Sequence, residues 1–246
     1  MSGHSKWATT KRRKAAVDAK RGQIFTKLAK LITIAVRDGD TDPNTNPNLR
    51  VAIDNARSFS MPKENIERAI QRGAGGDDSI KIEEIVYEAY GPGGIALIIE
   101  CLTDNKNRAI AEIKSILNKF GGSIAGNGSV VYKFKKIGQI IISQTENSKT
   151  ENSLTTEQLE EEIINSDADD FEKEDNTYIV YTNQNNLHQV KRKLEERKVK
   201  VESAELIMVP LNYIDISEEK KDSAINLLEA LDDLEDVNKV FTNISI

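Results

Sequence analysis

The side chains best suited to bind a ligand are the cations that crowd the start of the chain. The first 37 residues carry ten lysines and arginines and a single acid, Asp18. Several cations on one mobile or helical segment favour a polyanion, because each phosphate that they neutralise releases counterions. The cations that we predict to contact a sugar-phosphate backbone are Lys6, Lys11, Arg12, Arg13, Lys14, Lys20, Arg21, Lys27 and Lys30.

One aromatic side chain, Trp7, lies among these cations. An indole can stack on an unpaired base, a contact used in the recognition of RNA and of single strands. It can equally pack the N-terminal segment onto the helices that follow. The sequence leaves both roles open, and we count Trp7 with the candidate nucleic-acid-binding residues.

No residue pattern predicts catalysis, a metal site or a cofactor. The histidines are His4 and His188, and neither has partners at metal-ligand spacing or a nucleophile motif nearby. The sequence GPGG at 91–94 precedes a predicted strand, whereas a phosphate-binding loop precedes a helix. We therefore expect a type II turn there, with Pro92 and Gly93 at its centre.

The single cysteine and the hydropathy indicate a cytoplasmic protein without membrane association. Cys101 excludes an internal disulfide and, because it follows the run IALIIE, is expected to be a buried strand thiol. The longest apolar run, Ile95–Ile99, is far shorter than the about 18–20 residues of a membrane helix. The basic N-terminus lacks the apolar centre of a signal peptide.

Charge is divided unequally along the chain. The net charge is −6, yet residues 1–72 hold 15 basic and 7 acidic side chains, and the remainder holds 19 and 33. The first part therefore has a charge of +8 and the second a charge of −14, which is typical of a polyanion-binding end. Residues 144–176 alone carry twelve acids and two lysines. This stretch should turn away from nucleic acid or meet a basic protein.

Three helices are expected to position the cations. Residues 23–37 show helical spacing of apolar side chains, and the inward side consists of Ile24, Leu28, Leu31, Ile32 and Ala35. A separate stripe contains Lys20, Lys27, Lys30 and Arg37, and Ile34 interrupts it.

Two more helices follow a turn-rich loop at 38–48. The inward residues of the second helix are predicted to be Leu49, Ala52, Ile53 and Ala56. The third begins at Met61-Pro62, ends at Gly73 and turns Ile66, Ala69 and Ile70 inward.

After residue 80 the pattern changes to strands that alternate with helices. Predicted strands cover 85–90, 95–103, 129–134, 139–143, 177–182 and 198–206, and a strand, a helix and a strand close the chain from 207. We predict an α+β multidomain protein with an N-terminal three-helix domain and two ferredoxin-like α+β domains, one of them discontinuous. The predicted domains are a basic helical domain, 1–78; a discontinuous α+β domain, 79–134 with 206–246; and an inserted acidic α+β domain, 135–205.

Four stretches give the chain a family resemblance. Residues 3–32, which begin GHSKWATTKRRK, together with 46–73, 87–114 and 128–134, resemble the YebC/PmpR family of probable transcriptional regulators. This family includes the mitochondrial translational activator of cytochrome c oxidase. Where the family usually has Asn-Ile and then a histidine after the next lysine, this chain has Thr9, Thr10 and Arg12, and the positive charge is kept.

The resemblance implies a helical domain followed by two α+β domains, with no known catalytic activity or required cofactor. With the charge pattern, it favours a non-enzymatic DNA-binding regulator of transcription. The alternative is a translation factor that contacts ribosomal RNA through its basic end and ribosomal proteins through its acidic domain. A more remote alternative is an enzyme or a small-ligand sensor with a cleft between the α+β domains.

Overall fold

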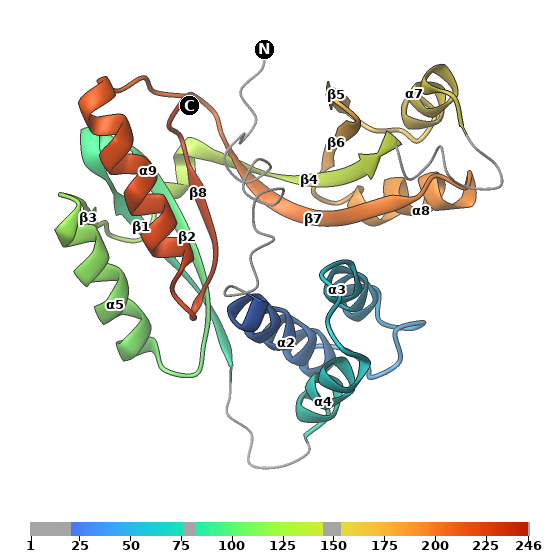
Figure 1. Cartoon of the computed structure of the whole chain (residues 1–246), viewed down its shortest axis with the longest axis horizontal. Helices are drawn as coiled ribbons and strands as arrows, with labels where there is room; N and C mark the ends of the chain where they lie inside the picture. The colour runs from blue at the N-terminus through green and yellow to red at the C-terminus, as the bar shows by residue number, and fades with distance from the viewer. Residues whose placement is uncertain (1–20, 76–81, 145–153, 246) are drawn as a thin grey trace. The chain divides into compact units, whose positions relative to one another are not determined.

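The computed structural model describes residues 21–75, 82–144 and 154–245. Within these ranges, seven α-helices and two four-stranded sheets form the α+β protein that the sequence predicts (Figure 1). The described residues group into two compact units. The first unit takes its residues from 1–41, 62–135 and 208–246, and the second from 42–61 and 136–207.

The first unit is built on an antiparallel sheet with a hairpin at its centre. Its strand order is β3 (Ser123–Ile124), β1 (Glu83–Tyr90), β2 (Ala96–Thr103) and β8 (Val237–Thr242). Helices α5 (Lys106–Lys119) and α9 (Glu218–Asp232) supply Ile113, Leu117 and a group of leucines to a core that also contains Leu97 and Ile99 of β2. One face of the sheet is thereby buried (Figure 1).

The second unit contains a ferredoxin-like sheet. The chain runs through β4 (Phe134–Ser143), α7 (Thr156–Ile164), β5 (Asp170–Glu174), β6 (Thr177–Asn183), α8 (Leu187–Glu196) and β7 (Val201–Pro210). The strand order is β5-β6-β4-β7, so the first strand of the unit lies between its third and its fourth. Both helices pack on the same core, which is lined by Ile140, Ile142 and Val180.

The two sheets differ in topology, although the sequence predicts the ferredoxin-like order for both. In the first unit the hairpin strands β1 and β2 are both internal, with β3 beside one and β8 beside the other. A ferredoxin-like sheet has one strand of its hairpin at an edge, as β5 is in the second unit. The α+β class follows from local sequence patterns. Which strands lie at the edges of a sheet depends on contacts between residues that are distant in sequence.

Helix α3 (Pro47–Ser58) agrees with its predicted pattern. Asn46 caps it by accepting a hydrogen bond from the backbone N–H of Leu49, and Pro47 occupies the first turn. Its buried residues are the four that the sequence predicts to face inward. The helix groups with the second unit, where Asp54 lies 3.7 Å from the ammonium group of Lys191 on α8.

The GPGG segment is a turn between β1 and β2, as predicted. The backbone N–H of Gly94 donates to the carbonyl oxygen of Gly91 over 3.0 Å, and Gly93 has φ 73° and ψ 8°. These angles are those of the third residue of a type II turn, a position that favours glycine. The turn leads into strand β2 and not into a helix, as a phosphate-binding loop would.

Residues 129–134 do not form the predicted strand. Val131–Lys133 is a single 3-10 turn, and β4 starts only at Phe134. The fourth strand of the first sheet is instead the short β3.

The carboxylate of Glu88 explains this difference. Its side chain, 8% exposed, accepts hydrogen bonds from the backbone N–H groups of Gly128, Val130 and Val131 over 2.6, 2.5 and 2.9 Å. Three N–H groups that converge on one carboxylate cannot also pair along a strand ladder. Burial raises the pKa of Glu88, but the three donors outweigh it, so the pKa lies below its ordinary value.

The end of the chain also differs from the prediction. The segment from Ile207 is expected to open a strand-helix-strand unit of the first sheet. Instead, β7 runs without a break from Val201 to Pro210 in the second sheet. Between β7 and α9, the described bridge is an isolated one from Ile214 to Ile244. Strands β4 and β7 thus run across the predicted domain junctions at 134/135 and 205/206.

We predict that Glu88→Gln lowers the free energy of unfolding by about 2–4 kcal/mol, because a neutral amide cannot accept three buried N–H donors as well as a carboxylate can. Urea denaturation measures the change. The matched control is Glu84→Gln on the same strand, where the side chain is exposed, and the expected change is within about 0.5 kcal/mol. Equal effects of the two substitutions would contradict the role given to Glu88.

Candidate nucleic-acid interface

The structure describes the side chains of only two of the ten candidate residues. Seven of them lie outside the described residues: Lys6, Trp7, Lys11, Arg12, Arg13, Lys14 and Lys20. Arg21 is the first residue of helix α2 (Arg21–Arg37). Lys27 and Lys30 lie within that helix, and both contact other described residues.

Helix α2 packs on helix α4 (Lys63–Gly73) through one of its sides. Leu28, Ile32 and Val36 are buried there together with Thr33. The hydroxyl of Thr33 donates hydrogen bonds to the carbonyl oxygens of Ala29 and of Ala69 on α4. A buried hydroxyl with two acceptors costs little to desolvate, so it fixes the pairing of the two helices.

The described residues of the cationic stripe on α2 contact other elements of the same unit. The ammonium group of Lys27 donates to the carbonyl oxygen of Asp232 over 2.7 Å. Asp232 is the last residue of α9, and the final carbonyl groups of a helix lack partners in their own helix and carry partial negative charge. Lys27 therefore acts as a cationic cap on α9.

Lys30 forms the centre of the contact. Its ammonium group lies 2.9 Å from one carboxylate oxygen of Asp236, which is 2% exposed. Arg108, on α5, donates to the other oxygen through Nε and Nη2 over 3.0 and 2.7 Å. The second carboxylate at Arg108, Asp104, is 2.7 Å from Nη2. Asp236 thus has a cation on each oxygen.

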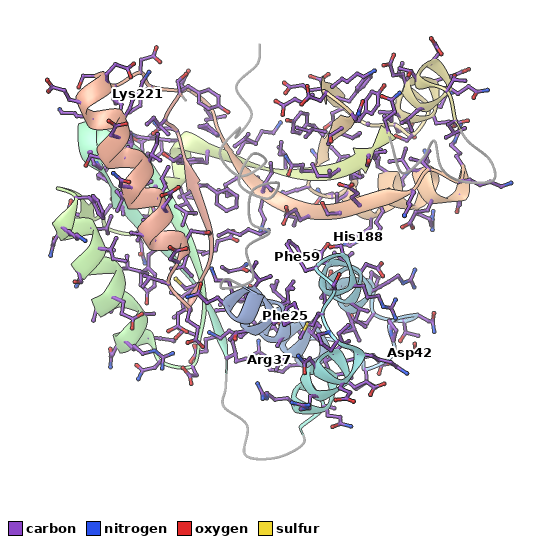
Figure 2. The ribbon with its side chains drawn as sticks, viewed as in Figure 1. Phe25, Arg37, Asp42, Phe59, His188 and Lys221 are labelled. Atoms are coloured by element: carbon purple, nitrogen blue, oxygen red, sulfur yellow. The ribbon has the colours of Figure 1, made fainter. Side chains whose placement is uncertain are left out.

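Ile34 and Arg37 complete the stripe. Ile34 is 5% exposed and packs with Ile82 and Leu102, the latter on β2. Arg37, at the end of α2, donates to the carbonyl oxygen of Ile82 and pairs with Asp38 (Figure 2). An apolar residue in the middle of a cationic stripe is the expected composition of a surface that is buried within the protein.

These contacts change the candidate set. Lys27 and Lys30 have acceptors inside the protein, and the Lys30 side chain is only 13% exposed. Moving either ammonium group to a phosphate would break a contact that holds α2 in place. We therefore leave these two lysines out of the candidate interface, which now consists of the predicted residues from Lys6 to Arg21.

The ion pairs also set the charge of Asp236. Burial raises the pKa of this carboxyl group, and the hydrogen bonds from Lys30 and Arg108 lower it by more, so that the pKa lies below its ordinary value. The same pairing raises the pKa of Arg108, chiefly through its hydrogen bond with Asp236. The carboxylate is therefore ionised throughout the physiological range.

The residues with chemical reactivity are dispersed. Cys101 is 1% exposed on β2, and burial raises the pKa of its thiol to about 12. His188, labelled in Figure 2, is an exposed residue of α8. In the described parts of the chain, no three His, Cys, Asp or Glu side chains gather as metal ligands would. None of the described helices combines the length and apolarity that crossing a membrane requires.

Sequence reasoning missed the partners of the stripe. Asp236 and Arg108 lie 206 and 78 positions after Lys30, so no local pattern links them. One signal was present in the sequence. Ile34 interrupts the stripe, and an apolar residue at that place favours a packed surface over a solvated one.

The chain matches two family models that together cover most of its length. One is described as the TACO1/YebC protein N-terminal domain and matches residues 5–76, and the other as the TACO1/YebC second and third domain and matches residues 82–244.

Similar proteins cover the whole chain. Two are named probable transcriptional regulatory protein, from Halothermothrix orenii and Chloroherpeton thalassium, and are 43% and 47% identical. Each alignment spans 100% of this chain and 96% of the relative. The crystal structure of a conserved hypothetical protein from Aquifex aeolicus has a TM-score of 0.85 and 39% identity, and covers 94% of this chain and 93% of its own.

We predict that Asp236→Asn lowers the free energy of unfolding by about 2–4 kcal/mol, because it leaves two cations beside a neutral amide. Asp222→Asn, on the exposed side of α9, is the control and should change it by less than about 0.5 kcal/mol. Urea denaturation gives the difference, and hydrogen exchange of α2 shows whether the loss is located there. Unchanged protection of α2 would refute the assignment.

Acid should act on the same contact. Because the pKa of Asp236 is lower in the folded protein, its stabilisation is complete above the ordinary aspartate value of 3.8 and is lost as the pH falls through the lower folded value. The difference in unfolding free energy between the wild type and Asp236→Asn should therefore shrink below about pH 4. A difference that grew on acidification would contradict this sign.

Cys101 should be unreactive in the folded protein. A buried thiol with a pKa of about 12 is almost wholly protonated at pH 8. Titration with a chromogenic disulfide reagent is expected to find no accessible thiol in buffer and one thiol per chain in urea. Rapid reaction in buffer would show that β2 opens or that the thiolate is stabilised.

Proposed function

Because this chain belongs to the TACO1/YebC family, we propose that it is a non-enzymatic regulator of gene expression that binds nucleic acid through its basic N-terminal segment. The relatives named probable transcriptional regulatory protein support a regulatory role. The proposed target is DNA, and the proposed site of action is the cytoplasm. The residues that bind the phosphates are the predicted cations from Lys6 to Arg21.

The charge of the first 21 residues is the observation that carries the proposal. They contain seven lysines and arginines and one acid, Asp18, which gives a charge of +6 in a chain with a net charge of −6. Lys27 and Lys30 use their charges inside the first unit. The other candidate cations, from Lys6 to Arg21, are concentrated in one short segment. When closely spaced cations bind a nucleic acid, they release counterions from it.

Helix α2 supports this function by its attachment. One side of the helix packs on α4 and another is held by Asp236, Asp232 and the cluster around Ile34. The basic segment therefore begins at a fixed point of the first unit. A fixed origin reduces the conformational freedom that binding must remove.

A second candidate function is a ribosome-associated translation factor. In this case the basic segment binds ribosomal RNA, Trp7 stacks on an unpaired base, and the acidic part of the second unit meets basic ribosomal proteins. The observation that favours it is charge separation, because residues 144–176 carry twelve acids and two lysines. Duplex DNA alone would leave so acidic a surface without a partner.

Two experiments separate the candidates. For DNA, a labelled promoter fragment is bound, and unlabelled promoter DNA or random DNA is added as competitor. Sequence-specific regulation requires that the promoter DNA displaces the labelled fragment better than random DNA does. For the ribosome, a lysate is sedimented at low and at high salt, and association requires that the protein migrates with ribosomes at low salt and dissociates at high salt. Equal competition removes the first candidate, and failure to co-migrate at low salt removes the second.

We predict that replacing Lys11, Arg12, Arg13 and Lys14 together by glutamine weakens nucleic-acid binding and flattens its salt dependence by up to about four counterions. The affinity is measured by fluorescence polarisation over a range of salt concentrations. Unfolding in urea should be unchanged for residues 82–245, which lie outside the altered segment.

The matched control removes the same charge elsewhere. Replacing Arg192, Lys193, Arg197 and Lys198, on and after α8, by glutamine also lowers the net charge by four. The ion pairs that three of these cations make are at the surface and contribute little stability. If this control weakened binding as much as the N-terminal variant, net charge and not the basic segment would be responsible.

A further inference from the structure

An exposed aromatic and apolar patch lies at the turn that precedes β4. Tyr132 is 65% exposed and its neighbour Val131 is 41% exposed. Leu211, 59% exposed, is held beside them because its backbone N–H donates to the carbonyl oxygen of Lys133 over 2.8 Å. These three residues are half of the large hydrophobic side chains that are exposed among the described residues.

The turn that carries the patch is held from beneath. Glu88 accepts three of its backbone N–H groups, and the chain reverses at Gly128, where φ is +82°. Tyr90 adds a hydrogen bond from its hydroxyl to the carbonyl oxygen of Ser129 over 2.9 Å. Val131 and Tyr132 are thus presented on a fixed backbone, which lowers the entropic cost of binding.

A cation is positioned against the rings. The ammonium group of Lys133 lies 5.3 Å from the ring centre of Tyr90 and 5.8 Å from that of Tyr132. Such cation–π contacts orient the ammonium group, and they do not require a carboxylate to accept its hydrogen bonds. Lys135, two residues later, is exposed.

The local charge is opposite to that of the surrounding sequence. Residues 113–145 contain no aspartate or glutamate, and their lysines are Lys114, Lys119, Lys133, Lys135 and Lys136. By contrast, residues 73–246 as a whole carry 33 acids and 19 cations. The aromatic patch therefore lies in a positively charged interruption of an acidic sequence.

We propose that this patch is a second nucleic-acid contact, at which Tyr132 stacks on an unpaired base of single-stranded RNA and Lys133 and Lys135 contact the flanking phosphates. The inference rests on the second candidate function, in which the basic segment binds RNA, and it names the part of that ligand which the patch contacts. Interleaved rings and lysines are the composition of sites that hold single strands. Unpaired bases next to phosphates are displayed chiefly by RNA loops, whereas the bases of a duplex are stacked on one another.

The charge of Lys133 favours a nucleic acid over a protein as the ligand of this patch. An apolar protein surface would cover Val131, Tyr132 and Leu211 but would also have to desolvate Lys133, and lysine is depleted in the centres of protein interfaces. A phosphate beside Lys133 offsets that cost. The patch thus suits a ligand that combines a flat apolar face with negative charge.

Polarisation of a labelled 12-nucleotide single-stranded RNA tests the proposal on the full chain. Tyr132→Ala should weaken binding about 5- to 150-fold, the range for the loss of one base–aromatic stack. Tyr132→Phe should bind like the wild type, and Tyr132→Leu should bind as weakly as the alanine variant. Lys133→Gln with Lys135→Gln should reduce the salt slope by about 1–1.5.

Matched controls address the other occupants. Ile164→Ala removes a side chain of the same 65% exposure from α7 and should leave binding unchanged. The same RNA annealed to its complement should bind without dependence on Tyr132, and a single-stranded DNA of the same sequence should bind more weakly than the RNA. Because Tyr132 is exposed, urea denaturation should show equal stability for its variants.

Three results would overturn the proposal: unchanged affinity of Tyr132→Ala, wild-type affinity of Tyr132→Leu, and equal losses on single strand and duplex. They differ from failure of the proposed function, in which the wild type binds no nucleic acid and the N-terminal glutamine variant changes nothing. If the N-terminal variant loses affinity and Tyr132→Ala does not, the proposed function stands and the second contact is refuted.

Discussion

The pairing of one buried carboxylate with two cations determines how the first unit can act. Asp236 holds Lys30 of α2 on one oxygen and Arg108 of α5 on the other. A lone carboxylate buried to this degree would be neutral, and a lone lysine at this place would prefer water. Together they connect α2 to the start of β8, the first helix and the last strand among the described residues. This contact holds α2, the helix that follows the basic segment in the sequence.

Glu88 uses the same chemistry with a different partner. It gathers three backbone N–H groups where Asp236 gathers two side chains, and in both cases burial and hydrogen bonding act on the pKa in opposite directions, with hydrogen bonding the stronger. One carboxylate holds a helix and the other holds a turn. A count of charges along the sequence therefore overstates the number of acidic side chains that face solvent, because hydrogen-bond donors enclose these two carboxylates.

The sequence predicts those features that are encoded locally. The four buried residues of α3 and the turn at Gly93 follow from a period of 3.6 and from the φ that glycine permits. The spacing of the cations on α2 is visible in the sequence, but the intramolecular acceptors of Lys27 and Lys30 are not, since Asp232 and Asp236 are some 200 positions away. Val130 and Val131 have strand propensity, and the carboxylate of Glu88 overrides it. For the stripe and for residues 129–134, the deciding partner is distant in sequence.

The basic segment and the Tyr132 patch belong to the same unit, and this links their proposed contributions. Residue 21 begins a helix fixed to the first sheet, and Tyr132 follows a loop fixed to β1 of that sheet. A fully extended chain of 20 residues reaches at most about 70 Å. When one contact holds a nucleic acid, the other meets it at the effective concentration set by that reach, which for short tethers is millimolar. Two weak contacts can then give firm binding, and the loss of either one removes more affinity than it supplies alone. The two contacts would also have different roles. Phosphate binding by the basic segment does not depend on the base sequence, whereas stacking on Tyr132 requires an unpaired base.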